Sequence, residues 1–385
     1  KMVSDFMKII IDDKIPYIRG AFENVAEVVY LPGSKTTPEV VKDADAILTR
    51  TRTICNEKLL AGSSVKFIAA ATIGYDHIDT DYCDAAGIKW TNAPGCNSKS
   101  VEQYIASVLM VLADRKNLQL KDLCIGIVGV GNVGSKVARI CEIFGMKVLL
   151  NDPPRERAEG SEKFVNIDRI KEEADIITLH VPLNMKGEDA TYHMADDIFF
   201  NSLKRNPILI NSCRGEVVET NAVKNALKTG KISGFVCDCW ENEPDIELEL
   251  LKMTELATPH IAGYSKDGKA TGTQMSVQAI SNFFNLELNN WQPSGVEPPA
   301  NPVIKIDGEG LSEQEILSKA ILHTYDIRND DQLLRADTSN FEQQRGDYPV
   351  RREFPAYTIK TENVEKKTLE KLRQLGFIAP YRVPI

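Results

Sequence analysis

The sequence lacks a long hydrophobic run and a surplus of positive charge, and each absence excludes a class of protein. Its longest apolar stretch, Tyr104–Ala113, has the length of a buried core helix and is too short to cross a bilayer. Asp and Glu together number 55 against 46 Lys and Arg, which gives a formal net charge of −9. Since nucleic acids and anionic membranes bind basic surfaces, we expect neither as a partner.

Cysteine and histidine are sparse and scattered, which argues against a metal site. The eight cysteines form no C-x-x-C pair, and they share no metal-ligand spacing with the five histidines. Several cysteines stand within apolar runs, as buried thiols do. With no signal peptide visible, this favours a reducing compartment, and we expect a cytoplasmic protein without a bound metal.

What the sequence contains is a repeated alternation of short apolar runs with helical stretches. Candidate strands in the first part of the chain are Ile9–Ile11, Val28–Leu31, Ala46–Thr49, Phe67–Ala71 and Ile88–Thr91. A second series follows at Leu123–Val128, Lys147–Asn151, Ile176–Val181, Ile208–Ser212, Phe235–Cys237 and Leu256–Ala257. Strands that alternate with helices favour parallel sheets, so the pattern predicts an α/β protein with two Rossmann-like, doubly wound domains.

Two amphipathic helices mark the passages of the chain between these domains. The first is expected over Asn97–Asp114, and the second, over Lys269–Asn285, returns the chain to the first domain. We therefore predict a discontinuous substrate domain of residues 7–98 and 266–290. Residues 99–265 form the predicted nucleotide-binding domain, with a cleft between the two.

Residues 291–385 are expected to form a C-terminal α+β domain. The segment begins with the linker W-Q-P-S-G-V-E-P-P-A-N-P, which is rich in proline. Helical patterns follow at Ser312–Thr324 and Val364–Leu375.

A glycine loop, G-V-G-N-V-G, predicts that the second domain binds a dinucleotide. An apolar strand precedes the loop and a helical run follows it, as the function requires. Gly129 permits the tight turn, Gly131 lets the backbone approach a pyrophosphate, and Gly134 permits close helix–strand packing. Asp152 follows about twenty residues later, where an acid binds the ribose hydroxyls and repels a 2′-phosphate. The cofactor is therefore expected to be NAD; Arg155 and Arg157 keep NADP as a weaker alternative.

Three polar residues at predicted strand ends suggest hydride-transfer chemistry on a hydroxy acid. Arg214 offers a planar fork that matches a substrate carboxylate. His260 suits proton transfer, because imidazole titrates near neutrality. Glu243 can hold the imidazole and favour its protonated form. Each residue alone is more often structural, so the prediction rests on the three together.

These residues lie in motifs that resemble the D-isomer-specific 2-hydroxyacid dehydrogenase family: G-V-G-N-V-G, N-S-C-R-G-E-V-V-E, D-C-W-E-N-E-P and T-P-H-I-A-G-Y-S. In that family the Arg, Glu and His of these motifs are catalytic, which implies the same of Arg214, Glu243 and His260. The resemblance also implies a set of further cofactor-lining residues. They are Asn132, Val133, Val181, Ser212, Cys213, Asp238 and Gly263.

The remaining chain resembles one branch of this family, in M-K-I-I-I-D-D-K-I-P-Y, A-T-I-G-Y-D-H-I-D, Y-D-I-R-N-D-D and Y-P-V-R-R-E-F. That resemblance implies oxidation of a 4-phosphorylated four-carbon 2-hydroxy acid to its 2-oxo acid. It also implies substrate contacts at Thr51, Thr72 and Tyr264, with Thr51 standing where such enzymes commonly carry serine. The tail would then be a dimerisation domain, and the protein a homodimer.

The substrate phosphate needs cations, since the chain is acidic overall. Arg50 and Arg52 are candidates in the first domain, and Arg351 and Arg352 are candidates if a partner subunit's tail contributes. For each of these two arginine pairs, the alternative that the side chains are simply solvated at the surface has equal weight.

Two other functions remain open on the sequence alone. Another dehydrogenase of the same family, such as one for phosphoglycerate, would share the three residues, although the tail lacks the βαββαβ-like pattern of a regulatory module. An NAD-sensing scaffold is the other possibility. It is disfavoured because a scaffold needs no acid–base pair.

Overall fold

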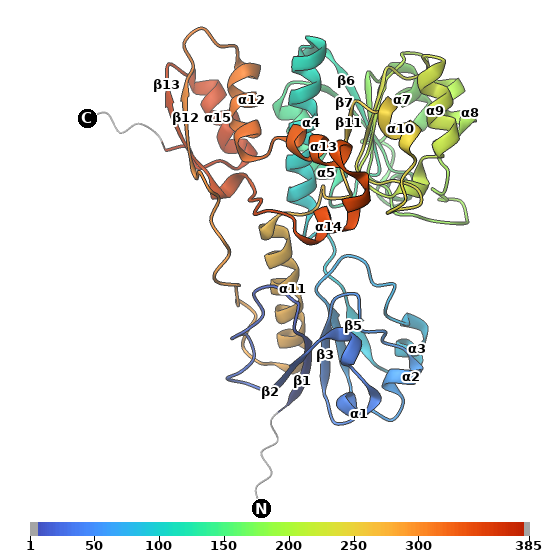
Figure 1. The fold of residues 1–385 in the computed structure, drawn as a ribbon, viewed down its shortest axis with the longest axis vertical. Coiled ribbons are helices and arrows are strands. Elements are labelled where there is room, and N and C mark those ends of the chain that lie inside the picture. The colour runs from blue at the N-terminus through green and yellow to red at the C-terminus, as the bar shows by residue number, and fades with distance from the viewer. Residues whose placement is uncertain (1–6, 381–385) are drawn as a thin grey trace, which may run out of the picture. The chain divides into compact units, whose positions relative to one another are not determined.

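The computed structural model describes residues 7–380 and divides the chain into two compact units (Figure 1). The first unit takes the chain up to Asn97 together with Ser265–Glu297. The second takes Ser98–Tyr264 and the chain from Pro298 onward. In the described part of the chain, no helix combines the length and apolar character needed to cross a bilayer.

The first unit is built on a five-stranded parallel sheet in the order β2-β1-β3-β4-β5. The strands are β1 (Lys8–Asp12), β2 (Glu27–Leu31), β3 (Ala46–Thr49), β4 (Phe67–Ala70) and β5 (Lys89–Thr91). Its helices are α1 (Pro38–Val41), α2 (Glu57–Leu60), α3 (Thr80–Ala85) and α11 (Lys266–Phe284). β3 and β4 are buried along their whole length, since helices cover both faces of a doubly wound sheet.

Helix α11 belongs to this first unit although it follows the second sheet in the sequence. Ser265 caps its first turn by accepting from the Gly268 backbone N–H at 2.8 Å. One turn later, a Cβ placed on Gly272 would lie 2.7 Å from the carbonyl oxygen of Ala71. Glycine therefore lets α11 press against the loop that follows β4.

The second unit contains a six-stranded parallel sheet in the order β11-β10-β9-β8-β6-β7. The strands are β6 (Cys124–Val128), β7 (Lys147–Asn151), β8 (Ile176–Leu179), β9 (Ile208–Asn211), β10 (Gly234–Cys237) and β11 (Leu256–Ala257). The helices are α4 (Ser98–Lys116), α5 (Gly134–Ile143), α6 (Pro153–Glu159), α7 (Ile167–Glu173), α8 (Asp197–Ser202), α9 (Thr220–Lys228) and α10 (Leu248–Met253). The predicted fold class is confirmed, with strand order reversing between β6 and β8, where such sheets bind ligands.

The C-terminal segment packs within the second unit (Figure 1). It carries a parallel strand pair, β12 (Val303–Asp307) with β13 (Thr358–Glu362). Its helices are α12 (Glu313–Thr324), α13 (Ile327–Ala336), α14 (Phe341–Gly346) and α15 (Lys366–Leu375). The sequence patterns missed α13 and α14, because α14 buries one apolar side chain and α13 buries two aspartates along its apolar face. The division into three domains stays a prediction.

Arg351 joins the C-terminal segment to the rest of the second unit. The side chain is 4% exposed. It donates to the side chain of Gln103 and to the backbone carbonyls of Ser100, Ile261 and Ala262. These bonds engage all three guanidinium nitrogens within the same chain, which contradicts the hypothesis that Arg351 reaches a substrate phosphate.

We predict that Arg351→Met destabilises the fold by about 3 kcal/mol, because it removes buried charge-assisted hydrogen bonds to the Gln103 side chain and to three backbone carbonyls. Urea unfolding monitored by circular dichroism gives the free energy of unfolding. Lys367→Met is the matched control, since that side chain is 69% exposed and its ion pair contributes little. Equal stability of the two variants would show that the Arg351 bonds are dispensable.

Candidate active site

Arg214, Glu243 and His260 follow three neighbouring strands of the six-stranded sheet. Arg214 comes after β9, Glu243 after β10 and His260 after β11, and these strands are adjacent and parallel. The carboxyl ends of parallel strands meet at one edge of a sheet, where open α/β sheets bind ligands. Glu243 and His260 are in direct contact, with Oε2 2.8 Å from Nδ1.

The loop of Arg214 is held against the loop of Glu243 by a glycine. A Cβ placed on Gly215 would overlap the backbone of Trp240, so the R-G dipeptide brings the two loops into contact. Trp240 donates its backbone N–H to Oε1 of Glu243 at 2.8 Å. Contacts thus run from Gly215, next to Arg214, through Trp240 to Glu243 and His260.

A buried carboxylate, Asp238, holds the loop that carries His260. Oδ1 accepts from the hydroxyl of Thr258 at 2.6 Å and from the Ile261 N–H at 2.8 Å. Oδ2 accepts from the Ala262 N–H at 3.0 Å. Burial raises the pKa of Asp238, while the charge of His260 and these hydrogen bonds act in the opposite direction. Its role at the nicotinamide stays a prediction; what the structure shows is a loop anchor.

His260 has a left-handed backbone, with φ of 56°. Residues other than glycine adopt this region rarely, and it persists where the surroundings impose it, often at functional sites. The bonds of Asp238 to Ile261 and Ala262 impose it here. The backbone turn directs the imidazole toward Glu243, whose Oε2 holds Nδ1.

His180 lies nearby in the second unit but is unsuited to proton transfer. It follows β8, and its Nε2 is 2.9 Å from the Thr178 hydroxyl. Burial lowers the pKa of His180 to about 3, so the imidazole stays neutral at physiological pH. The ring is thus a fixed, neutral hydrogen-bonding group.

Cys239 adds a third donor atom beside the Glu243–His260 pair. The three residues offer one potential metal ligand each, all within 4.8 Å of one another. Burial raises the pKa of the Cys239 thiol well above its usual value, and the thiol points to Asp238 with Sγ–Oδ2 of 3.9 Å. A protonated thiol is a poor metal ligand. We therefore interpret the group as an acid–base pair beside a buried thiol.

The three glycines of the loop have different surroundings. A Cβ on Gly129, whose φ is 87°, would lie 2.5 Å from the His180 carbonyl oxygen. A Cβ on Gly134 would overlap the carbonyl of Gly129, where α5 begins. A Cβ on Gly131 meets nothing within 4 Å. The space above Gly131 is the place where a pyrophosphate would meet the helix N-terminus.

Asp152 is placed at the end of β7 as an NAD-binding acid requires. Its carboxylate accepts from the backbone N–H of Val130 at 2.8 Å, within the glycine loop, and caps α6. Arg155 is paired with Glu159 at 2.6 Å and Arg157 with Asp189 at 2.5 Å. Acidic partners already engage both arginines, which weakens the NADP alternative.

The other predicted cofactor residues lie around the same sheet edge. Val181 follows β8, and one of its methyl groups is 2.9 Å from the Cβ position of Gly129. Ser212 and Cys213 follow β9, and the Ser212 hydroxyl oxygen is buried without a hydrogen-bond partner in the described structure. A buried orphan hydroxyl is unusual and fits a ligand that would supply the missing partner. Asn132 and Val133 lie in the glycine loop, and Gly263 follows the His260 loop.

The three predicted substrate residues fall in both units. Thr51 follows β3 and Thr72 follows β4 in the first unit, and the Thr72 hydroxyl donates to the Arg50 carbonyl at 3.2 Å. Tyr264 ends the first part of the second unit, three residues after Ile261, whose carbonyl accepts from its N–H at 2.9 Å. Their contacts with a substrate stay predictions.

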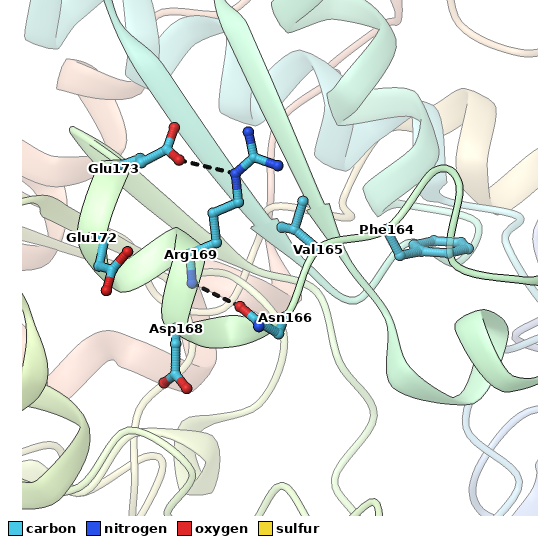
Figure 2. A pocket seen from close by; sticks show the side chains of 7 residues that line it. All are labelled: Phe164, Val165, Asn166, Asp168, Arg169, Glu172 and Glu173. Atoms are coloured by element: carbon cyan, nitrogen blue, oxygen red, sulfur yellow. Dashed lines mark hydrogen bonds and ion pairs between the residues drawn. The ribbon is translucent and has the colours of Figure 1, made fainter.

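An open hollow of about 430 Å³ lies elsewhere, at the start of α7 (Figure 2). It is lined by Phe164, Val165, Asn166, Asp168, Arg169, Glu172 and Glu173. Figure 2 shows Arg169 bonded to Glu173 and, through its backbone, to Asn166. None of the predicted site residues lines it, and its acidic wall does not suit a phosphorylated ligand.

Comparison with known proteins places this geometry in a family. Residues 102–262 match the NAD binding domain of the D-isomer specific 2-hydroxyacid dehydrogenases, and residues 298–376 match a domain of unknown function. The erythronate-4-phosphate dehydrogenase of Bacteroides fragilis is 53% identical over 92% of this chain and 99% of its own. The erythronate-4-phosphate dehydrogenase of Klebsiella pneumoniae is 39% identical over 97% of this chain and 98% of its own length. The chain belongs to the D-isomer specific 2-hydroxyacid dehydrogenase family. It is an NAD-dependent oxidoreductase of that family.

Solved structures agree on the fold. D-lactate dehydrogenase from Aquifex aeolicus, complexed with NAD and lactic acid, is 28% identical with a TM-score of 0.57, covering 76% of this chain and 100% of its own. D-mandelate dehydrogenase from Rhodotorula graminis has a TM-score of 0.60 at 21% identity, and the match covers 76% of this chain and 99% of its own. The second likeness shows the fold alone.

We predict that alanine at two glycines of the loop changes different quantities, NAD affinity at Gly131 and thermal stability at Gly134. Gly131→Ala should leave the melting temperature unchanged and weaken NAD binding about tenfold or more, since its Cβ enters the pyrophosphate space. Gly134→Ala should lower the melting temperature, because its Cβ overlaps Gly129. Differential scanning fluorimetry and NADH fluorescence titration measure the two quantities. NAD affinity unaltered in Gly131→Ala would mean that the cofactor lies elsewhere.

Proposed function

We propose that the chain oxidises 4-phospho-D-erythronate to 2-oxo-3-hydroxy-4-phosphobutanoate with NAD, a step of pyridoxal 5′-phosphate biosynthesis. The observation that carries the chemistry is the Glu243–His260 pair at the sheet edge that also bears the glycine loop and Arg214. The substrate rests on the relatives, which are named erythronate-4-phosphate dehydrogenases and match nearly end to end.

The proposed roles follow from the hydrogen bonds of each side chain. With Nδ1 of His260 held by Glu243, the neutral imidazole carries its proton there and presents the Nε2 lone pair to the C2 hydroxyl. Nε2 would take the proton of the C2 hydroxyl, and NAD, when bound, would supply the hydride acceptor. Glu243 stabilises the imidazolium that results.

Arg214 is proposed to hold the substrate carboxylate and to stabilise the developing C2 carbonyl. Its Nη1 donates to the Cys213 carbonyl at 2.7 Å, which orients the guanidinium from the end of β9. The planar fork then fixes the carboxylate, and with it the face of C2 that meets the cofactor.

Cations in the first unit support a phosphorylated substrate. Burial lowers the pKa of Lys269, and the neighbouring charges of Lys266 and Arg50 lower it further. Arg50 is oriented by a bond from Nη1 to the Lys14 carbonyl at 2.9 Å, and its own carbonyl meets Thr72. Positive charge concentrated beside two predicted substrate threonines, in a chain of net charge −9, favours a dianionic ligand.

We predict that His260→Asn lowers kcat for 4-phospho-D-erythronate by roughly 10²- to 10⁴-fold, the contribution typical of a general base. Glu243→Gln should give a smaller loss, since it keeps the orienting bond and removes the charge. NADH affinity, measured by fluorescence, should change in neither variant. Retained kcat in His260→Asn would eliminate the proposed base.

The substrate itself is tested with a panel. The enzyme should oxidise 4-phospho-D-erythronate with a kcat/KM well above that for 3-phosphoglycerate, with NADH formation as the readout. Preference for 3-phosphoglycerate would reassign the substrate within the family. An Arg214→Ala variant that loses turnover but keeps a cellular role would support the NAD-sensing scaffold.

We further propose a homodimer formed through the C-terminal segment, in the cytoplasm. Val303 and Ile378 are 42% and 53% exposed and flank Thr358 on the small sheet, so an apolar row lies open there. All eight cysteines are free thiols, as in a reducing compartment. Val303→Lys with Ile378→Lys should convert the dimer to a monomer by sedimentation analysis. An unaltered mass would place the interface elsewhere.

A further inference from the structure

Arg345, on α14 of the C-terminal segment, lies beside the proposed active site of its own chain. Its guanidinium carbon is 5.7 Å from the centre of the Tyr264 ring. The Tyr264 ring also packs edge-on against the ring of Tyr348, which belongs to the C-terminal segment as well, with ring centres 5.7 Å apart. The C-terminal segment therefore covers the residue predicted to contact the substrate.

The guanidinium of Arg345 is only partly satisfied. The side chain is 23% exposed, and its Nε is buried with no hydrogen-bond partner among the described residues. Nη1 is paired with Glu342 at 2.8 Å, but Glu342 is 63% exposed and can turn away into solvent. A buried donor without an acceptor is costly, so an arginine held this way is suited to an anion that arrives from outside.

The contact with Tyr264 brings Arg345 close to the loop of His260, since the Tyr264 N–H donates to the carbonyl of Ile261 at 2.9 Å. Although burial acts to lower it, the pKa of Arg345 is raised by Tyr264, Glu342 and Glu243, so the guanidinium is charged at all relevant pH. Glu243 is the partner of His260. A cation that senses Glu243 and touches Tyr264 lies within reach of a short substrate bound at His260.

Relatives indicate which anion it meets. The Aquifex D-lactate dehydrogenase, solved with lactic acid, matches 76% of this chain along all of its own length. The unmatched quarter has the size of the C-terminal segment. The Bacteroides erythronate-4-phosphate dehydrogenase, in contrast, matches 92% of this chain. Lactate and 4-phosphoerythronate share a carboxylate and a C2 hydroxyl, and 4-phosphoerythronate adds a C3 hydroxyl and a C4 phosphate, of which only the phosphate is an anion.

We propose that Arg345 is a specificity residue that binds the substrate phosphate, supplied by the C-terminal segment to the active site of the same chain. The proposal rests on the function proposed above. It gives the domain of unknown function a task beyond dimerisation: it carries the cation that distinguishes a phosphorylated hydroxy acid from a plain one. Arg214 remains the carboxylate ligand, and Tyr264 is the surface against which the guanidinium is held.

The test compares 4-phospho-D-erythronate with unphosphorylated D-erythronate in Arg345→Gln. The variant should lose roughly tenfold to hundredfold in kcat/KM for the phosphorylated substrate, mostly in KM, as expected for a lost bond to a charged group. Its slow turnover of D-erythronate should stay within about twofold. Arg345→Lys should recover part of the loss, since lysine binds phosphate as a point charge. Glu342→Gln, which frees the guanidinium, should lower KM for the phosphorylated substrate.

Arg328→Gln is the matched control, because Arg328 lies on the neighbouring α13 and pairs only with the adjacent Asp326 among the contacts that the described structure gives it. This control should leave kcat/KM for both substrates unchanged. An equal loss of kcat/KM for both substrates in Arg345→Gln would show that Arg345 only supports Tyr264, and it would overturn the proposal. An unchanged KM for 4-phospho-D-erythronate would overturn it as well.

A second readout separates this proposal from the proposed function. Inorganic phosphate should raise the melting temperature of the unaltered protein more than that of Arg345→Gln. If the enzyme fails to oxidise 4-phospho-D-erythronate while this difference is present, the assigned substrate is wrong and the phosphate site stands. If phosphate stabilises both proteins equally, the site is wrong whatever the substrate.

Discussion

The proposed active site depends on one buried carboxylate. Asp238 is 1% exposed and accepts from Thr258, Ile261 and Ala262, the residues on either side of His260. A buried charge is tolerated only where hydrogen bonds satisfy it, so the loop must wrap around the carboxylate. That wrapping gives His260 its left-handed backbone and aims the imidazole at Glu243. The geometry of the proposed catalytic pair is thus set by a residue that need not touch the substrate.

A second support comes from the far end of the chain. Arg351 donates to the carbonyls of Ile261 and Ala262, the two residues whose N–H groups bind Asp238. Two side chains of opposite charge therefore hold the Ile261–Ala262 loop: the Asp238 carboxylate binds its N–H groups, and the Arg351 guanidinium binds its carbonyl oxygens. Because Arg351 belongs to the C-terminal segment, that segment contributes to the geometry of His260 as well as to its own core.

The proposed substrate contacts divide along chemical lines. The groups proposed to act on C2, namely Arg214, Glu243 and His260, come from consecutive strand ends of the nucleotide-binding sheet. Groups proposed for the phosphate come from elsewhere: Arg50 from the first unit and Arg345 from the C-terminal segment. This separation explains why enzymes for small hydroxy acids can share the sheet and its chemistry without the additional segment.

The sequence by itself determined the two parallel sheets, the glycine loop and the positions of Arg214, Glu243 and His260 at strand ends, because each follows from local pattern. Strand positions such as Ala46–Thr49 and Lys147–Asn151 agree with β3 and β7. β3 is fully buried and is a continuous apolar run, and the edge strand β7 keeps an apolar run behind its exposed Lys147. Helix α13 was missed because buried Asp330 and Asp331 interrupt its apolar face. Only the tertiary structure decided the contacts of Arg351 and Arg345. Arginines are usually solvated, and neither the burial of one nor the orphaned Nε of the other leaves a trace in the neighbouring residues. Their partners lie far away in sequence, and contacts of that kind exist only once the chain has folded.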